Sequence, residues 1–210
     1  MAIEHLIYDF DGTISDSYAL FLRFWNEVAE KHGIVVPVTQ EALYRELKKT
    51  GYDAYLVLKC ENVLSYEDFM ADFHALQEKH RMDFKPYPEA IELLKRAKQA
   101  GKKNYLYTHT GPVVKKMLEN MGILDCFEFI LDASYHFPLK PAPDALLFLQ
   151  QKLKLDPDTC IMIGDRPIDA LAGQNAGMKG CLWDSEGLFS PEGMDYYIKD
   201  LRTVAEIVGF

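Results

Sequence analysis

Short apolar runs alternate with longer amphipathic stretches along most of this chain, and this alternation limits the fold more than any other feature. The runs are His5–Tyr8, Asn104–Tyr107, Glu128–Leu131, Cys160–Ile163, Gly180–Trp183 and the shorter Tyr196–Ile198. Their lengths are typical of buried strands. The stretches between them begin at prolines or end at glycines that suit helix ends: Pro88–Ala100, Pro112–Gly122, Ala142–Leu153 and Pro167–Ala176. The pattern predicts an α/β fold with a parallel sheet covered by helices on both faces.

One interval interrupts the alternation, because no strand pattern occurs between Asp16 and His80. Four helical patterns occupy it: Asp16–Lys31, Gln40–Lys49, Tyr52–Cys60 and Ser65–Lys79. Ser65 is a candidate N-cap for the last of them. So much helix is too long for a single crossover between strands. We therefore predict an α/β core made of residues 1–15 and 81–210, with a small all-helical domain, residues 16–80, inserted after the first strand.

The acidic charge balance restricts the partners of this chain. The formal net charge is −9, which argues against a broad nucleic-acid surface. An anionic substrate gains nothing from such a field, so any phosphate site has to be built locally from a metal ion, a lysine and backbone N–H groups. We expect a small-molecule partner and no nucleic acid.

Other sequence features favour a soluble cytoplasmic protein. The segment from Met1 to Thr13 lacks the charged-then-apolar layout of a signal peptide, and no apolar stretch is long enough to span a membrane. The four cysteines form no compact cluster and are expected to be isolated thiols in a reducing compartment. We expect no membrane partner and either a monomer or a homodimer.

Two acids follow the first strand pattern in the segment Asp9-Phe-Asp11-Gly-Thr. Residues two apart in an extended segment point to the same side, so both carboxylates can face one spot at the strand end. Such a pair needs a cation between its members or a proton on one of them. A carboxylate beside a metal can attack phosphorus, and a protonated one can protonate a leaving oxygen. A plain Asp-Gly turn is the alternative.

Polar residues follow two further strand patterns. Thr108, at the end of the second, suits phosphate oxygens together with the backbone N–H groups that precede a helix. His109 follows it, and its main-chain N–H is expected to matter more than its ring. Lys140, in a proline-flanked loop after the third strand pattern, can neutralise both a phosphate and a nucleophile. An ordinary N-cap for Thr108 and a solvent-exposed side chain for Lys140 remain open alternatives.

A second acid pair follows the fourth strand pattern. Asp165 ends the apolar run, and Asp169 lies one helical turn later on the same side. Ligands of open parallel sheets bind at the carboxyl ends of the strands, so these acids are expected near Asp9. Carboxylates from two strands offer the hard oxygen ligands that Mg²⁺ prefers. The alternative is a pair of helix-capping aspartates.

The order of these motifs resembles the haloacid dehalogenase superfamily, in the branch of the phosphoglycolate-phosphatase-like and β-phosphoglucomutase-like proteins. The resemblance covers the whole chain and implies a Rossmann-like core with an inserted helical cap. It implies Asp9 as nucleophile and Asp11 as general acid and then base. It also implies Mg²⁺ on Asp9, the Asp11 carbonyl and Asp165, with Asp169 behind the ligands. Thr108, the His109 N–H and Lys140 would hold the phosphoryl group.

The same resemblance predicts where substrate choice is made. The segment Leu47–Tyr55 corresponds in position to a substrate-specificity loop of the sugar-phosphate mutases. Lys48, Lys49 and Tyr52 are therefore candidate specificity residues, with a solvated helix end as the alternative.

The sequence leads to one favoured function and leaves others open. The favoured one is Mg²⁺-dependent hydrolysis of small phosphate monoesters, such as phosphoglycolate or sugar phosphates, through an aspartyl-phosphate. An acid at position 11 favours phosphate over carbon–halogen bonds, because a leaving alcohol needs a proton. A sugar phosphomutase of the β-phosphoglucomutase type is the alternative, and a catalytically idle binding protein is a third reading.

Overall fold

The computed structural model describes residues 2–210. Within these residues, the core is a single parallel sheet of six strands. The strands are β1 (His5–Tyr8), β2 (Lys103–Tyr107), β3 (Phe127–Leu131), β4 (Cys160–Gly164), β5 (Lys179–Trp183) and β6 (Tyr196–Ile198). Their order is β3-β2-β1-β4-β5-β6, and every pairing is parallel. The predicted α/β fold is confirmed. Since β2 and β4 flank β1, the carboxyl ends of all three meet at the middle of one sheet edge.

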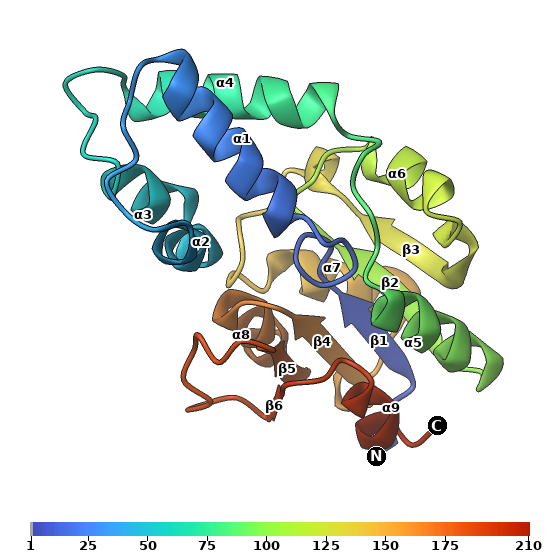
Figure 1. Cartoon of the computed structure of the whole chain (residues 1–210). Helices are drawn as coiled ribbons and strands as arrows, with labels where there is room; N and C mark the ends of the chain where they lie inside the picture. The colour runs from blue at the N-terminus through green and yellow to red at the C-terminus, as the bar shows by residue number, and fades with distance from the viewer. Residues whose placement is uncertain (1) are drawn as a thin grey trace. The chain divides into compact units, whose positions relative to one another are not determined.

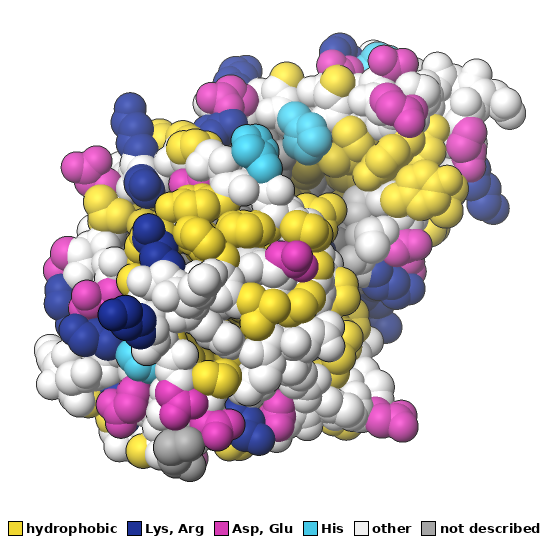
Figure 2. All heavy atoms as spheres, turned by 180° about the vertical axis from the view of Figure 1, so that it is seen from behind, with side chains coloured by type: hydrophobic (Ala, Val, Ile, Leu, Met, Phe, Trp, Pro, Cys, Tyr) yellow, Lys and Arg dark blue, Asp and Glu magenta, His cyan; other side chains and the backbone are white. Residues whose placement is uncertain are grey.

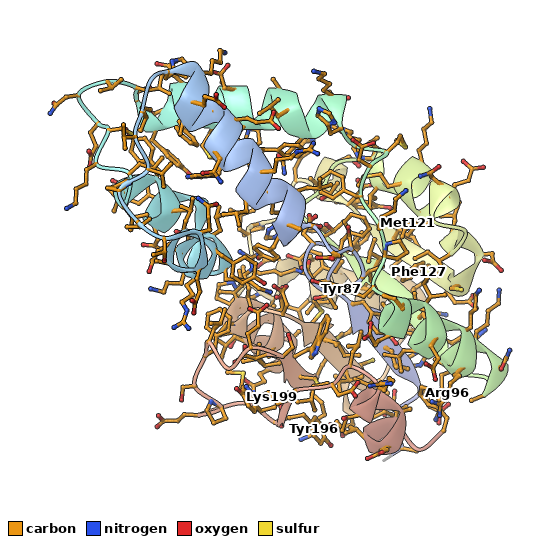
Figure 3. The ribbon with its side chains drawn as sticks, in the orientation of Figure 1. Tyr87, Arg96, Met121, Phe127, Tyr196 and Lys199 are labelled. Atoms are coloured by element: carbon orange, nitrogen blue, oxygen red, sulfur yellow. The ribbon has the colours of Figure 1, made fainter. Side chains whose placement is uncertain are left out.

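Helices cover both faces of this sheet (Figure 1). The core helices are α5 (Pro88–Gln99), α6 (Val114–Asn120), α7 (Asp144–Leu153), α8 (Pro167–Asn175) and α9 (Thr203–Val208). On one face, α7 and α8 pack with alternate strand residues such as Ile7, Tyr107 and Met162 in a single buried cluster. On the other face, α5 packs on β2 and α9 on α5. Arg96 of α5 also donates a hydrogen bond to the Phe210 carbonyl at 3.3 Å (Figure 3). Burial on both faces explains why the strands are continuously apolar rather than alternating.

The four remaining helices form a compact unit of their own, residues 16–84. They are α1 (Tyr18–Lys31), α2 (Gln40–Lys49), α3 (Gly51–Leu56) and α4 (Tyr66–Lys79). Trp25 of α1 lies against Phe69 and Phe73 of α4, with ring centroids 4.6 and 5.1 Å apart. The Ser65 side chain accepts the Asp68 N–H at 3.1 Å, so the predicted N-cap of α4 is confirmed. Aromatic packing thus gives this short helical segment a core without help from a sheet.

The chain leaves and rejoins the core at neighbouring points. One compact unit runs to Ser15 and resumes at Lys85. Ser15 forms an antiparallel bridge with Pro86, and the Tyr87 N–H donates to the Ile14 carbonyl at 2.9 Å. The return comes a few residues after the predicted boundary at residue 80, because the Phe84 ring packs against Phe21 at 5.8 Å within the helical unit.

Two predicted helices have different ends in the structure. The helix predicted from Pro112 begins as α6 at Val114, because the preceding residues form a turn in which the Val114 N–H donates to the Gly111 carbonyl. The helix predicted over Tyr52–Cys60 is α3 and ends at Leu56. Beyond it, Lys59 adopts a left-handed φ of 52°, which a helix cannot continue through.

Two other sequence features have simple outcomes in the structure. All four cysteines are buried free thiols, as expected for isolated thiols. No helix within residues 2–210 combines the length and the apolar character needed to cross a membrane. Figure 2, which shows the molecule from behind, has charged side chains and groups of hydrophobic ones on the visible face.

Candidate active site

The segment after β1 is folded into a tight turn that fixes the first acid pair. The Asp9 N–H donates to the Ile163 carbonyl of β4 at 2.9 Å, so Asp9 continues the strand ladder. The carbonyl of the buried Phe10 then accepts the N–H groups of Thr13, Ile14 and Ser15 at 3.3, 2.9 and 2.8 Å. Gly12 supplies the positive φ of 80° that this turn needs. The turn therefore holds Asp9 at the strand end with little freedom.

Lys140 is the central cation of the site, although it lies 131 residues after Asp9. Its side chain is buried, and its Nζ donates to Asp9 Oδ1 at 2.6 Å and to Asp169 Oδ1 at 2.8 Å. Lys140 Nζ also donates a third hydrogen bond, to the Tyr107 carbonyl at 3.0 Å. A buried ammonium with all three donors engaged on fixed acceptors has one stable position. The solvent-exposed alternative for Lys140 is excluded.

Three carboxylates gather beside this lysine. Asp9, Asp165 and Asp169 are all buried, and one oxygen from each lies within 4.8 Å of the others. The Arg166 N–H donates to Asp169 Oδ2 at 3.1 Å, and Thr13 Oγ1 donates to Asp165 at 3.4 Å. These contacts hold two of the carboxylates at set positions before any ligand arrives.

Gly164 lets Asp169 come this close to the end of β4. A Cβ at position 164 would lie 2.2 Å from the Asp169 Cβ, far inside van der Waals contact. The strand can therefore pass directly beneath the Asp169 side chain only with glycine at this position. The spacing of Gly164, Asp165 and Asp169 in the sequence is thus a packing requirement as well as a chemical one.

Burial and the shared lysine set the protonation of these groups. Burial raises the pKa of Asp9 to about 7, although Lys140 opposes the rise. For Asp169, burial also opposes the charged form, but Lys140, Arg166 and their hydrogen bonds outweigh it and hold its pKa below the usual value. Burial likewise opposes the charge of Lys140, yet its two carboxylate partners raise its pKa. Asp169 and Lys140 thus form a charged pair, and Asp9 is the carboxyl of this cluster whose charge changes near neutral pH.

The end of β2 brings Thr108 and Asp11 into one hydrogen-bonded group. Thr108 Oγ1 accepts the Thr110 N–H at 3.0 Å, and Thr110 Oγ1 donates to Asp11 Oδ2 at 2.9 Å. The Asp11 carboxyl is therefore oriented by the loop after β2. The ordinary N-cap alternative for Thr108 is also excluded, because α6 begins only at Val114 and its N-cap residue is Val113.

His109 is held as a neutral ring. Its Nε2 accepts the Lys140 N–H at 3.3 Å, which leaves the ring proton on Nδ1. Burial and the nearby Lys140 lower the pKa of His109 to about 4. The ring carries no charge at neutral pH and cannot counter an anion. This agrees with the expectation that its main-chain N–H matters more than its ring.

The structure brings together most of the predicted core residues and adds others. Asp9, Asp165, Asp169 and Lys140 share one contact network, as predicted, and Asp169 is part of the acidic cluster itself. Sequence reasoning missed Thr110 and Thr13. The signal for Thr110 was the second hydroxyl in Thr-His-Thr-Gly, two residues after Thr108. Thr13 had a weaker signal, since it closes the segment that starts at Asp9.

The three candidate specificity residues lie in the helical unit and differ in their surroundings. Lys48 is buried, with its Nζ 4.2 Å from the centre of the Tyr18 ring. Lys49 pairs with Glu46 at 2.9 Å. Tyr52 is half exposed and packs edge-on against Tyr66 at 5.1 Å. Their part in substrate choice stays a prediction.

The chain is similar to known hydrolases in sequence and in fold. The model of the family described as haloacid dehalogenase-like hydrolase matches residues 6–182. Pyrophosphatase PpaX of Bacillus velezensis is 27% identical, over 99% of this chain and 97% of its own length. Phosphoglycolate phosphatase of Vibrio vulnificus is also 27% identical, over 83% of this chain and 81% of its own. A superfamily hydrolase of subfamily IA from Geobacter sulfurreducens shares the fold, with a TM-score of 0.69 at 20% identity over 98% and 100% of the two chains.

Proposed function

The chain is an enzyme of the haloacid dehalogenase-like hydrolase family, and we propose that it is a Mg²⁺-dependent phosphatase of small phosphate monoesters. The observation that carries the proposal is the buried Lys140 ammonium between Asp9 and Asp169, with Asp165 beside them. Burying several charges is costly even when they are paired, and clusters of this kind gather at functional sites.

The acidic cluster suits Mg²⁺ by its chemistry. Buried carboxylate oxygens from Asp9, Asp165 and Asp169 lie close together, and hard oxygen donors are what this ion binds. We propose that Asp9, the Asp11 carbonyl and Asp165 hold the ion, while Asp169 fixes Lys140 and supports the ligands from behind. When bound, Mg²⁺ would offset the charge of the carboxylates and of the phosphoryl oxygens.

The side chains of this site can perform a two-step hydrolysis. An Asp9 oxygen attacks phosphorus, the bond to the leaving oxygen breaks, and Asp11 gives that oxygen a proton. Water then attacks the phosphorus of the aspartyl-phosphate while Asp11 takes a proton from that water. The bond to Asp9 breaks, phosphate is released and the Asp9 carboxylate is regenerated. Thr108 and the His109 N–H would bind the phosphoryl oxygens throughout, and Lys140 would stabilise them by its positive charge.

Small substrates are proposed from the names of the relatives. The relatives act on phosphoglycolate and pyrophosphate by their names, and both are small anions. We propose a small phosphorylated metabolite of this kind or a sugar phosphate, selected by the helical unit as a cap that carries Lys48, Lys49 and Tyr52. A panel of phosphorylated metabolites, assayed for free phosphate, tests this choice. Equal, slow turnover of every compound would contradict it.

Chelation of divalent metal is expected to remove turnover of 4-nitrophenyl phosphate, and added Mg²⁺ is expected to restore it. Mg²⁺ should also raise the melting temperature in the absence of substrate, because a ligand that binds only the folded state stabilises it. Asp165→Asn should lose most of this thermal shift, whereas Asp158→Asn, an exposed change at the other end of β4, should keep it. Full activity in the chelated enzyme would refute the metal dependence.

Thr110→Val is expected to slow substrates with poor leaving groups more than those with good ones. The change keeps the shape of the side chain but removes the hydroxyl that orients the Asp11 carboxyl. Loss of one hydrogen bond to the protonated Asp11 carboxyl corresponds to about 3- to 10-fold in rate. That loss should appear in kcat/KM for an alkyl phosphate and be smaller for 4-nitrophenyl phosphate, whose leaving oxygen needs no proton. Thr110→Ser is the matched control, and equal losses on both substrates would argue against Asp11 as the acid.

A further inference from the structure

Arg166 is a cation of the candidate site to which the proposed reaction assigns no part. It follows Asp165 directly and is the N-cap residue of α8, where its backbone N–H donates to Asp169 Oδ2 at 3.1 Å. The residue is half-buried, and its Nε is fully covered by other atoms. The side chain is therefore folded against the protein rather than extended into solvent.

The charge of Arg166 acts on groups from three separate segments. Burial is the largest influence on the pKa of Asp9, of Asp169 and of His109. The positive charges of Lys140 and Arg166 also act on all three, and each lowers the pKa. The three residues belong to the end of β1, to α8 and to the loop after β2, so a charge that acts on all of them lies where these segments meet.

Arg166 differs from Lys140 in what it offers a ligand. The Lys140 ammonium already donates three hydrogen bonds to protein oxygens. A guanidinium carries five N–H donors in a planar fork, which matches the two oxygens of a carboxylate or phosphate. Lys140 and the proposed Mg²⁺ together balance the three carboxylates of the cluster. The charge of Arg166 is therefore left for the substrate.

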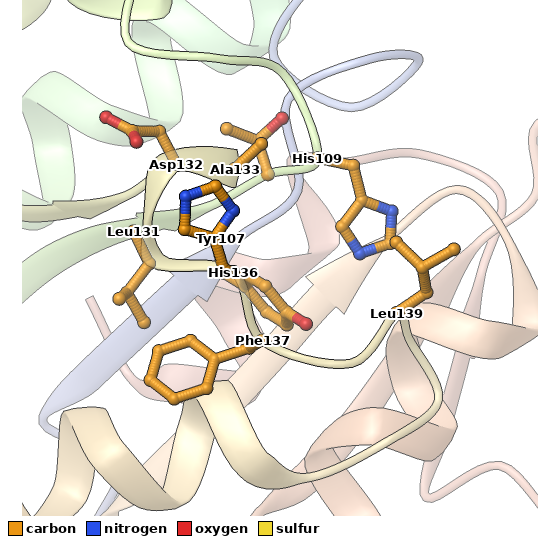
Figure 4. Close-up of a pocket in the computed structure, with 9 residues that line it drawn as sticks. Tyr107, His109, Leu131, Asp132, Ala133, His136, Phe137 and Leu139 are labelled. Carbon is orange, nitrogen blue, oxygen red and sulfur yellow. The ribbon is translucent and has the colours of Figure 1, made fainter.

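The His109 ring provides a second donor in the same region. Its Nε2 accepts the Lys140 N–H at 3.3 Å, so the ring proton lies on Nδ1. Part of the residue is open to solvent, and this Nδ1–H has no acceptor among residues 2–210. Figure 4 shows the ring beside Leu139, the residue before Lys140. The neutral ring adds no charge, but its fixed N–H can donate to an anionic oxygen.

We propose that Arg166 and the His109 Nδ1–H form a subsite for a second anionic group of the substrate, a carboxylate or phosphate on the alcohol half of the ester. Both are then specificity-determining residues rather than catalytic ones. The inference rests on the proposed function and narrows it, because esters with an anionic leaving group are preferred over sugar phosphates with an uncharged one. Part of the substrate choice is thus made in the α/β unit.

Phosphoglycolate and its amide, phosphoglycolamide, differ in the anionic group alone and are the matched substrates. The wild type should show a kcat/KM about 10- to 100-fold higher for phosphoglycolate, the effect of hydrogen bonds between charged groups. Arg166→Met should bring this ratio close to one. Any effect of the variant on Asp9 or on the metal is common to both esters and cancels in the ratio.

Two further variants test the two donors. Arg166→Lys keeps the charge but loses the fork, so its ratio should lie between those of the wild type and Arg166→Met. His109→Phe keeps a ring without a donor and should lower the ratio about 3- to 10-fold, the effect of one hydrogen bond. Arg202→Met is the matched control and should keep the wild-type ratio, because Arg202 is also the N-cap residue of a core helix but pairs with Asp200 at the surface.

Binding gives a readout without turnover. In 3-phosphonopropionate a methylene replaces the ester oxygen of phosphoglycolate, so the molecule cannot be hydrolysed. Calorimetry with Mg²⁺ present should show that the wild type binds it more tightly than its amide, and that Arg166→Met loses this preference.

The subsite and the phosphatase activity can fail separately. The subsite is overturned if the wild type hydrolyses ester and amide with equal kcat/KM, or if Arg166→Met keeps the wild-type ratio. It is also overturned if Arg202→Met lowers the ratio as much as Arg166→Met. Preferential, Arg166-dependent binding of 3-phosphonopropionate by a protein that hydrolyses neither substrate would instead refute the phosphatase and support the subsite.

Discussion

Asp9→Asn is expected to lower turnover of an aryl phosphate on the order of 10⁴-fold or more, the scale seen when an enzyme loses its nucleophile. The amide oxygen can still accept from Lys140, and the Lys140–Asp169 pair is untouched, so the fold should be retained. Steady-state kinetics with excess Mg²⁺ measures the loss. Acid-quenched mass spectrometry should find phosphate on the Asp9 peptide of the wild type and none on the variant.

The control for this experiment is another aspartate-to-asparagine substitution in the α/β unit. Asp158→Asn lies at an exposed position before β4 and should retain wild-type turnover. Circular dichroism and melting temperature verify that both variants are folded. Turnover of Asp9→Asn within tenfold of the wild type would remove the aspartyl-phosphate mechanism.

Lys140→Met is expected to damage both stability and activity. Methionine has nearly the same length but leaves the carboxylates of Asp9 and Asp169 without their cation. Removing one partner from a buried ion pair destabilises a fold by about 3–5 kcal/mol. Loss of the positive charge beside the phosphoryl group should lower kcat/KM by about 10²- to 10³-fold. Urea unfolding without divalent metal measures the first effect, and initial rates with Mg²⁺ measure the second.

A second substitution tests the reason for the lost stability. If uncompensated charge is the cause, Lys140→Met with Asp169→Asn should be more stable than Lys140→Met alone, a non-additive result expected for residues in contact. Mg²⁺ should also stabilise Lys140→Met. The exposed Lys116→Met is the control and should be neutral in both assays. A double variant that is less stable than the single one would contradict the explanation.

The sequence was sufficient to predict the fold and the edge of the sheet at which the candidate site lies. Apolar runs ending at Asp9, Thr108 and Asp165 are local signals, and the parallel topology places their ends together. Asp169 was found because a helix period links it to Asp165. Gly164, the last residue of β4, was visible in the sequence, but the structure was needed to show that it leaves space for Asp169.

The rest depended on contacts between distant segments. Nothing local indicates that Lys140 reaches Asp169 as well as Asp9, or that Thr110 orients Asp11 across 99 residues. The turn at His136 was equally hidden. That residue takes a left-handed φ of 55° with no glycine or asparagine to signal it. Such features follow from packing, which periodicity does not encode.

The bridge between Ser15 and Pro86 has a consequence for how this architecture can vary. The chain leaves the core and returns to it at adjoining positions, which the bridge holds together. The core is therefore continuous whatever chain is inserted between them. Loop-closure cost grows only slowly with the length of the intervening chain. A longer, shorter or wholly different insert can therefore be exchanged at this point without shifting β1 against β2. With the helical unit proposed to choose the substrate, chemistry and selectivity are separately inheritable: one reaction centre can be kept while its choice of molecule is replaced in a single event.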